Sequence, residues 1–254
     1  MLVEARHREI IALLVNEGSV KVRGLAEQLE VSDDTIRRDL EALEKQGVLQ
    51  KTHGGAVSLD VPRMAREPRA RVASEAKAKI GEAAAATIAA GQTLIMDAGQ
   101  TVLEAARRLP IGPLTVITQS LDVAQVLSER TDIRLILIGG EWDRKQRFFR
   151  GIGTAQMMAH YRADVALLGA CAVHASFGVT ATDESDAVVK RAILQSSAKR
   201  LLLVDHTKFD RYEPFAVAAL GEYDSIITDR HSKAIASAAH VEVVQVGPIQ
   251  GSDA

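Results

Sequence analysis

Short apolar segments alternate with helix-forming segments in residues 75–254, and this alternation constrains the fold more than any other feature of the sequence. Seven segments have the length and apolar character of buried strands: 92–96, 114–118, 133–138, 163–168, 200–204, 223–228 and 241–246. Alternation of this kind is typical of βαβ units, in which helices connect the strands of a mostly parallel sheet. The sequence therefore predicts an α/β domain in this region.

Residues 3–58 follow a different pattern. Apolar residues recur at helical spacing in three short segments, which contain Ile10 and Leu14, then Val22, Leu25 and Leu29, then Ile36, Leu40 and Leu43. After the third segment, residues 48–52 and 56–59 flank the turn His53-Gly54-Gly55, and a turn of this composition between short strands predicts a hairpin. We therefore expect three helices followed by a two-stranded hairpin.

The stretch between these two regions has the composition of a linker. Residues 59–74 contain Pro62, Pro68 and four arginines, and they show no sustained periodicity. The sequence therefore predicts a small N-terminal domain at 1–58, a linker at 59–74 and an α/β domain at 75–254.

The three predicted helices have the order of a helix-turn-helix, whose last helix lies in the major groove of DNA. Ser32 is a good N-cap for this third helix, and Asp33 and Asp34 suit its positive end. An arginine on the exposed side of such a helix can bind guanine or a phosphate. The candidate DNA contacts on the helix and on the hairpin are Ser32, Thr35, Arg37, Arg38, Lys51 and His53.

The charge balance leaves an alternative open for the N-terminal region. The chain has 31 basic and 33 acidic residues, so its net charge of −2 gives no general indication of a nucleic-acid binder. Asp34, Asp39 and Glu41 also dilute the positive charge of the third helix. The alternative is a three-helix protein-interaction module with a solvated charged face.

Four motifs carry a resemblance to a known family. They are Arg6–Ile10, Val31–Leu40, Leu43-Glu44 and His53–Ala56, and they closely resemble the N-terminal winged helix of DeoR-family transcriptional regulators. The resemblance covers nearly the whole chain. It implies that the helix at 32–45 reads double-stranded operator DNA and that the hairpin is the wing. It also implies a C-terminal domain that is similar in fold to ribose-5-phosphate isomerases and CoA transferases and that senses a phosphorylated sugar or polyol.

Polar or glycine-rich turns follow five of the predicted strands. Ligands of open α/β sheets bind beyond the carboxyl ends of strands, and backbone N–H groups at a helix start can hold an anion. The candidate effector contacts are Asp97, Gly99, Gln100, Thr101, Thr118, Gln119, Ser120, Gly139, Gly140, Gly169, Asp205 and Lys208, to which the resemblance adds Asp186 and Lys190. The alternative is that these glycines and capping residues serve only the fold.

Three of these positions depart from the family's usual pattern. Gln100 stands where Thr or Ser is common, Gln119 where Asn is common, and Asp186 where Glu is common. Gln100 lacks a hydroxyl, Gln119 reaches one methylene further, and Asp186 reaches less far. We expect a pocket that accepts a polyhydroxylated anion but differs in shape from the family's usual pocket.

The segment 141–150 is expected to be a loop rich in cationic and aromatic residues. It contains Arg144, Lys145, Arg147 and Arg150 together with Trp142, Phe148 and Phe149. Such a loop can close over an anionic ligand, or its aromatic side chains can pack on the domain or on a second subunit. The sequence favours neither role.

A catalytic function is the alternative to regulation. Asp97, Asp186, Asp205, Lys190 and Lys208 are possible acids and bases for a sugar-phosphate isomerase with an accessory DNA-binding domain. The chain has no full isomerase signature, and the predicted N-terminal DNA-binding domain favours a regulator. The seven histidines have no metal-ligand spacing, so neither a metal nor a cofactor is expected.

Cysteine content and hydropathy point to a cytoplasmic protein without a membrane segment. The chain has one cysteine, and no apolar run approaches the roughly 18 residues of a membrane-spanning helix. One small winged helix seldom gives enough specificity by itself, so we expect a homo-oligomer, either a dimer or a tetramer, on a two-fold or repeated operator. A repressor is expected more than an activator.

Overall fold

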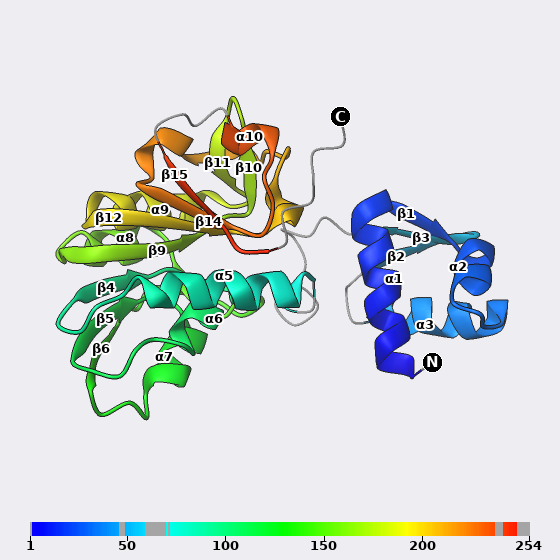
Figure 1. Ribbon diagram of the computed structural model, residues 1–254, viewed down its shortest axis with the longest axis horizontal. Coiled ribbons are helices and arrows are strands. Elements are labelled where there is room, and N and C mark those ends of the chain that lie inside the picture. The colour runs from blue at the N-terminus through cyan, green and yellow to red at the C-terminus, as the bar shows by residue number, and fades with distance from the viewer. Residues whose placement is uncertain (1, 46–48, 59–69, 71, 237–240, 248–254) are drawn as a thin grey trace. The chain divides into compact units, whose positions relative to one another are not determined.

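The computed structural model describes residues 2–45, 49–58, 70, 72–236 and 241–247 (Figure 1). The chain divides into two compact units, Met1–Ser74 and Glu75–Ala254. Most of the predicted linker, residues 59–69 and 71, lies outside the described residues. Among the helices of the described part, none has the length and the apolar composition needed to cross a membrane.

The N-terminal unit contains three helices and a three-stranded antiparallel sheet. The helices are α1 (Val3–Glu17), α2 (Val22–Gln28) and α3 (Asp33–Lys45), and the strands, in sheet order, are β1 (Ser19–Lys21), β3 (Gly55–Ser58) and β2 (Leu49–Thr52). The three helices and the hairpin agree with the predictions from sequence. Strand β1 was not predicted, because three residues with one apolar side chain, Val20, give no periodicity to read.

The core of this unit is formed by the apolar residues that define the helical spacing. Ile10, Ile36 and Leu43 are fully buried together, and Val72 also packs into this cluster. A Cβ atom on Gly55 would lie 1.8 Å from the carbonyl oxygen of Val20. Only glycine therefore lets β3 approach β1 closely enough to complete the sheet.

The C-terminal unit is built on a seven-stranded sheet in which every neighbouring pair is parallel. In spatial order its strands are β15 (Glu242–Gln245), β14 (Ser225–Thr228), β12 (Ser197–Val204), β9 (Ala163–Gly169), β4 (Thr93–Met96), β5 (Leu114–Thr118) and β6 (Ile133–Leu137). All seven predicted strands are present, and the prediction of a mostly parallel sheet is confirmed. The chain runs outward from β4 through β5 to β6 and then continues at β9, so the order reverses between β4 and β9.

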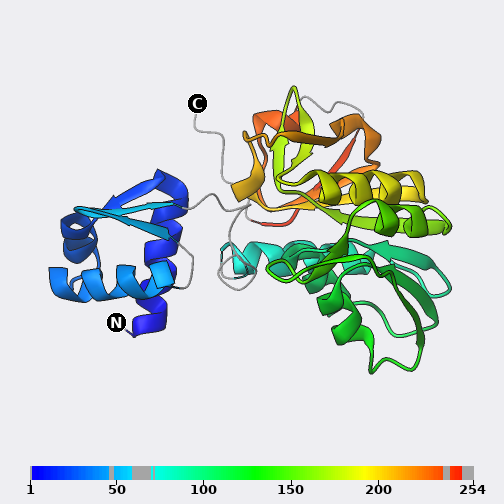
Figure 2. The same cartoon turned by 180° about the vertical axis from the view of Figure 1, so that it is seen from behind.

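Helices cover both faces of this sheet (Figures 1 and 2). One face carries α5 (Ser74–Ala86), α6 (Gln100–Ala106) and α7 (Leu121–Leu127), and the other carries α8 (Ile152–Met158), α9 (Glu184–Gln195) and α10 (Lys233–Ala236). Side chains alternate between the two cores, since Leu94 and Met96 pack on the first face and Ile95 on the second. Burial on both faces explains why the strands read as continuous apolar runs.

The sequence analysis missed several short strands. A small antiparallel sheet contains β10 (Ala172–His174), β11 (Gly178–Ala181) and β13 (Phe215–Ala218), and two short 3₁₀ helices lie at His206–Lys208 (η2) and Leu220–Glu222 (η3). The expectation of a loop at 141–150 is wrong, because β7 (Glu141–Asp143) and β8 (Phe148–Arg150) pair as a hairpin. Strands β7, β8 and β10, with three residues each, are too short to show a period of two.

Candidate functional site

Asp39 fixes α3, the candidate DNA-reading helix, against α1. Its carboxylate accepts hydrogen bonds from Arg6 Nε at 2.5 Å and Nη2 at 3.0 Å, and His7 Nε2 lies 3.0 Å away. Burial by itself would raise the pKa of Asp39, but the hydrogen bonds and charges of Arg6 and His7 outweigh it and lower that pKa. The interpretation that Asp39 dilutes the exposed positive face is therefore wrong, since the residue is buried and its charge is compensated.

The exposed side of α3 begins at the predicted N-cap. Ser32 Oγ accepts the backbone N–H of Thr35 at 3.2 Å, and the two hydroxyl oxygens lie 2.8 Å apart. Arg37 and Arg38 are exposed, and Arg38 Nη2 lies 2.8 Å from Asp34 Oδ2. Because an exposed pair of this spacing contributes only about 0.3–0.5 kcal/mol, Arg38 can leave Asp34 for a phosphate or a base.

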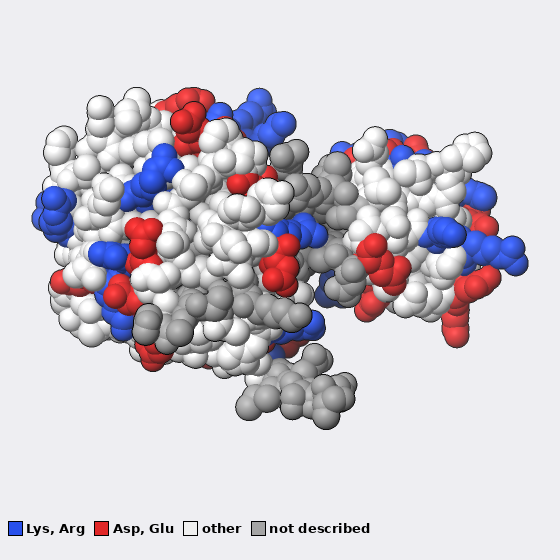
Figure 3. All heavy atoms as spheres, turned by 90° about the horizontal axis from the view of Figure 1, so that it is seen from above, with Lys and Arg blue, Asp and Glu red and all other residues white. Residues whose placement is uncertain are grey.

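A hydrogen bond joins the hairpin of the N-terminal unit to α3. Glu44 Oε1 accepts the backbone N–H of Lys51 at 2.8 Å, and His53 is exposed at the turn. Figure 3 shows Lys and Arg interspersed with Asp and Glu on the face that it draws, with no broad field of one sign among the described residues. Since the chain has 31 basic and 33 acidic residues, any binding of DNA by this unit depends on particular side chains rather than on a general positive charge.

In the C-terminal unit, predicted effector residues meet where the strand order reverses. Asp97, fully buried after β4, accepts hydrogen bonds from Gln119 Nε2 at 2.7 Å and from the backbone N–H of Gly169 at 3.1 Å. Lys190 of α9 donates to the same carboxylate, and its Nζ lies 3.2 Å from the carbonyl oxygen of Gly169. Open α/β sheets bind their ligands at such a reversal point, beyond the carboxyl ends of the strands.

The charges of this cluster are strongly coupled. Burial by itself would lower the pKa of Lys190, but Asp186, one helical turn earlier at 4.0 Å, and Asp97 outweigh it and raise that pKa. Lys190 is therefore a cation at neutral pH. Gln119 Oε1 is buried and has no hydrogen-bond partner among the described residues. A buried acceptor in that state costs about 1–3 kcal/mol, so it is an atom for a ligand hydroxyl or a water to satisfy.

A second buried cluster follows β12, the neighbour of β9. Asp205 accepts the backbone N–H of Thr207 at 3.0 Å, and the charges of Lys208 and Lys77 lower the pKa of Asp205 against the effect of its burial. Sequence reasoning missed Lys77, although the residue shares the buried face of α5 with Ile80 and Ala84 at helical spacing. Among the described residues, no three His, Cys, Asp or Glu side chains are grouped as metal ligands.

The turns before α6 and α7 differ in whether side chains of the protein hydrogen-bond within them. Gly99, with φ of +133°, precedes α6, and no side chain caps this helix start. Gln100 is half-buried there and Thr101 is buried. At α7, by contrast, Ser120 Oγ accepts the N–H of Val123 at 3.3 Å. Thr118 Oγ1 donates to the carbonyl of Met96 at 2.7 Å, so the second turn has its polar groups engaged by the fold.

Gly139 and Gly140 lie at the base of the β7–β8 hairpin. Thr154 Oγ1 lies 2.9 Å from the carbonyl oxygen of Gly139 and 2.8 Å from that of Arg150. Gly140 has φ of +150°, and a Cβ atom on it would lie 1.8 Å from Thr154 Oγ1. Gly140 is therefore required by the hairpin, whatever it contributes to a ligand, whereas a Cβ atom on Gly139 would meet nothing within 4 Å.

Two family models cover most of the chain. The DeoR-like helix-turn-helix domain matches residues 6–61, and the DeoR C-terminal sensor domain matches residues 72–230. The HTH-type transcriptional repressor GlcR of Bacillus subtilis is 35% identical over 91% of this chain and 90% of its own. The chain belongs to the DeoR family.

As a DeoR-family protein, the chain is a DNA-binding transcriptional regulator with a sensor domain, and its relatives are regulators rather than enzymes. The glycerol-3-phosphate regulon repressor of Escherichia coli is 32% identical over 88% of this chain and 90% of its own. Among solved structures, ribose 5-phosphate isomerase A from Methanocaldococcus jannaschii overlaps 54% of this chain and 55% of its own, with a TM-score of 0.40 and 15% identity. A likeness of that extent supports no conclusion about the activity of this chain.

Proposed function

We propose that this DeoR-family regulator is a repressor of carbohydrate-metabolism genes that responds to a phosphorylated sugar or polyol. The functions for which its relatives are named support this class, since they include repressors of the glycerol-3-phosphate regulon and of a lactose phosphotransferase system. An L-fucose operon activator from Haemophilus influenzae is also 28% identical, so activation is the second candidate. A regulator of chromosomal genes works where the DNA is, which favours a cytoplasmic protein.

The observation that carries the effector proposal is the cluster of Asp97, Gln119 and Lys190 at the strand reversal. A buried cation beside carboxylate and amide groups suits a ligand with one anionic group and several hydroxyls. The uncapped start of α6 lies directly after Asp97 and offers backbone N–H groups to a phosphate. Lys208 supplies a second buried cation at the carboxyl end of β12.

For the operator, we propose direct contacts from Ser32, Thr35, Arg37 and Arg38 of α3 and backbone contacts from Lys51 and His53 of the wing. The rigid attachment of α3 through Asp39 supports this role, because base contacts require a helix held in a fixed orientation. We further propose a homo-oligomer, a dimer or a tetramer, that places two such helices on a two-fold operator.

The test is a mobility shift with the intact protein on the DNA upstream of its own gene. We expect binding without ligand, and release on addition of glucose 6-phosphate, glycerol 3-phosphate or another phosphate ester of such a panel. Expression of a reporter from the same DNA separates repression from activation. A parallel assay for sugar-phosphate isomerisation should give no turnover. Turnover without any DNA binding would replace the regulator by the enzyme alternative.

A further inference from the structure

The β7–β8 hairpin is hydrogen-bonded along the turn that carries Gln119. The backbone N–H of Phe149 donates to the carbonyl of Gln119 at 2.9 Å, and the N–H of Leu121 donates to the carbonyl of Arg147 at 3.2 Å. Phe148 also forms a bridge with Ser120. One edge of the hairpin therefore lies directly against the residues that surround Asp97.

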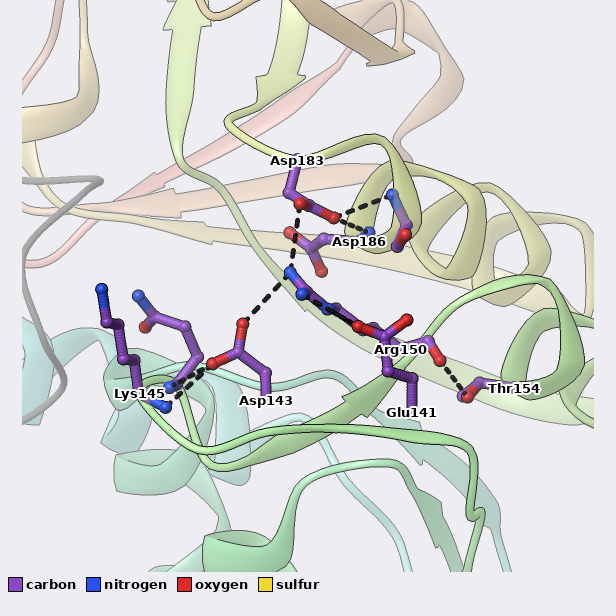
Figure 4. Close-up of polar contacts among 9 residues, drawn as sticks. Glu141, Asp143, Lys145, Arg150, Thr154, Asp183 and Asp186 are labelled. Carbon is purple, nitrogen blue, oxygen red and sulfur yellow. Dashed lines mark hydrogen bonds and ion pairs between the residues drawn. The ribbon is translucent and has the colours of Figure 1, made fainter.

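The other side of the hairpin reaches α9, the helix that carries Lys190. Arg150 Nη1 lies 3.1 Å from Asp183 Oδ2, and Asp183 is the N-cap of α9 (Figure 4). Within the hairpin, Arg150 also pairs with Asp143 at 3.2 Å and with Glu141 at 3.0 Å. The hairpin thus spans the candidate effector site from the turn after β5 to the start of α9.

The hairpin has the construction of an element that moves as one piece. Gly140 and Gly151 lie at its two ends with φ of +150° and +96°, backbone conformations that residues other than glycine rarely adopt. Thr154 holds the two ends together at the base. The two strands form a sheet of their own, so movement of the hairpin would break its bonds to the turn at residues 119–121 but no strand pairing of the seven-stranded sheet.

The cluster is buried, so a ligand can reach it only if a neighbouring element moves. Asp97 and Gln119 are 0% exposed and Lys190 is 4% exposed, so a molecule as large as a sugar phosphate cannot touch them while their surroundings stay closed. The hairpin contacts the Gln119 backbone and has a glycine at each end. It meets α9 through the guanidinium of Arg150 on Asp183 and through the N–H of Gly151, which donates to the carbonyl of Ser185 at 3.3 Å.

We propose that the β7–β8 hairpin is a flap over the effector site and that the contact between Arg150 and Asp183 is the clasp that closes it. This inference rests on the effector site proposed above. An open flap admits the ligand, and the clasp re-forms over it and slows its release. Arg150 is then a positioning residue, which acts through the hairpin rather than by touching the ligand.

Two variants isolate the clasp. Asn caps a helix about as well as Asp, so Asp183→Asn keeps the start of α9 and the pairs inside the hairpin but removes the charge that Arg150 meets. Arg150→Met removes the guanidinium itself. Arg144→Met is the matched control, because Arg144 is exposed on the same hairpin.

The probes are glucose 6-phosphate and glycerol 3-phosphate, titrated into the full-length protein by calorimetry and stopped flow. We expect both clasp variants to bind the ester roughly fivefold to tenfold more weakly, because it dissociates faster. The double variant should bind the ester no more weakly than Arg150→Met does. Wild-type affinity and release in both variants would overturn the clasp. Loss of binding in Arg150→Met alone would also overturn it, because Arg150 would then contact the ligand.

Trp142 provides a direct readout of the flap. It is the only tryptophan of the chain, it lies on β7, and its ring centroid is 5.2 Å from that of Phe149. Bound ester should change the Trp142 emission, and unchanged emission with ligand bound would contradict a moving flap. Without ligand, the Phe149 amide should exchange faster in both clasp variants than in Arg144→Met. If neither ester binds the wild-type protein, the proposed effector class fails for these probes, and the exchange rates alone decide the clasp.

Discussion

Each of the two units buries a charged cluster, and the two clusters are satisfied to different degrees. In the N-terminal unit, the Asp39 carboxylate receives two hydrogen bonds from Arg6 and lies within bonding distance of His7. In the C-terminal unit, Gln119 binds Asp97 through its nitrogen while its oxygen has no partner among the described residues. The first cluster is complete as a structural attachment, whereas the second still has an acceptor to offer.

The two clusters also lie in different kinds of place in their folds. Asp39 joins two helices inside a core, where no ligand needs to reach it. Asp97 and Lys190 lie at the carboxyl ends of β4 and β9, where the strand order reverses and ligands of open α/β sheets bind. A buried ion pair therefore indicates a function only when its place and its unsatisfied atoms agree.

The largest effect is expected from Asp39→Ala. This change removes the carboxylate that the buried Arg6 binds, and loss of one partner of a buried pair costs about 3–5 kcal/mol. Urea unfolding followed on the methyl signal of Ile36 should report that loss, while the signal of Ile95 in the C-terminal unit should be unchanged. Glu41→Gln is the control, because its exposed pair with Lys45 contributes well under about 1 kcal/mol. A loss below about 1 kcal/mol for Asp39→Ala would remove the distinction between the two pairs.

Lys190→Met should mainly lower the affinity for the effector. The ammonium is proposed to bind the effector as well as Asp97, and hydrogen bonds to charged groups contribute about 1.5–3 kcal/mol, so affinity for a bound phosphate ester should fall about 10-fold to 100-fold. Operator affinity without ligand should stay close to that of the wild type. If effector affinity is unchanged while stability falls, the Asp97 cluster is a structural attachment like that of Asp39.

Arg38→Ala tests the exposed side of the helix that Asp39 positions. If Arg38 contacts a base, specific operator affinity should fall by about 1–3 kcal/mol and preference at one operator position should relax. An equal loss on all sequences would assign Arg38 to a phosphate. Fluorescence anisotropy on operator and scrambled DNA distinguishes these results, and no loss with the fold intact would remove Arg38 from the interface.

The smallest effect is expected from acid. The pKa values of Asp39 and Asp205 are both lowered in the folded protein, so each contributes stability that is present above its unfolded pKa of about 4 and is lost as the pH falls through the folded value. Between pH 7 and 5 neither group should change the free energy of unfolding. Below about pH 4, protonation of each should lower that free energy by at most about 1.4 kcal/mol per pH unit. In Asp39→Asn, the urea midpoint of the Ile36 signal should depend less steeply on pH in that range.

The sequence predicted the elements that have strong periodicity. The seven parallel strands are apolar on both faces, and α3 repeats Ile36, Leu40 and Leu43 on one side, so both could be read without any long-range information. The hairpin β7–β8 could not, because its strands are short and its pairing depends on contacts with Gln119 and Asp183. Such contacts between distant segments leave no local pattern.

The candidate site was predictable in part for the same reason. Parallel strands bring Asp97, Gln119 and Gly169 to one edge, so their meeting follows from the sheet alone. Residues on covering helices are harder to place. Lys190 came only from the family resemblance, and Lys77 was missed although its spacing with Ile80 and Ala84 marks a buried face. The burial of Asp39 was also missed, because a lone carboxylate on a helix is more often exposed than paired.

The most direct test of the account is calorimetry on the intact protein with glucose 6-phosphate, glycerol 3-phosphate and the unphosphorylated compounds. If the carboxyl-end clusters form an anion site, the binding esters should bind at least about 10-fold more tightly than their dephosphorylated forms, and Lys208→Ala should remove most of that difference. Equal affinity for ester and free sugar, or an ester unaffected by Lys208→Ala, would contradict the site while leaving the DeoR-family assignment in place.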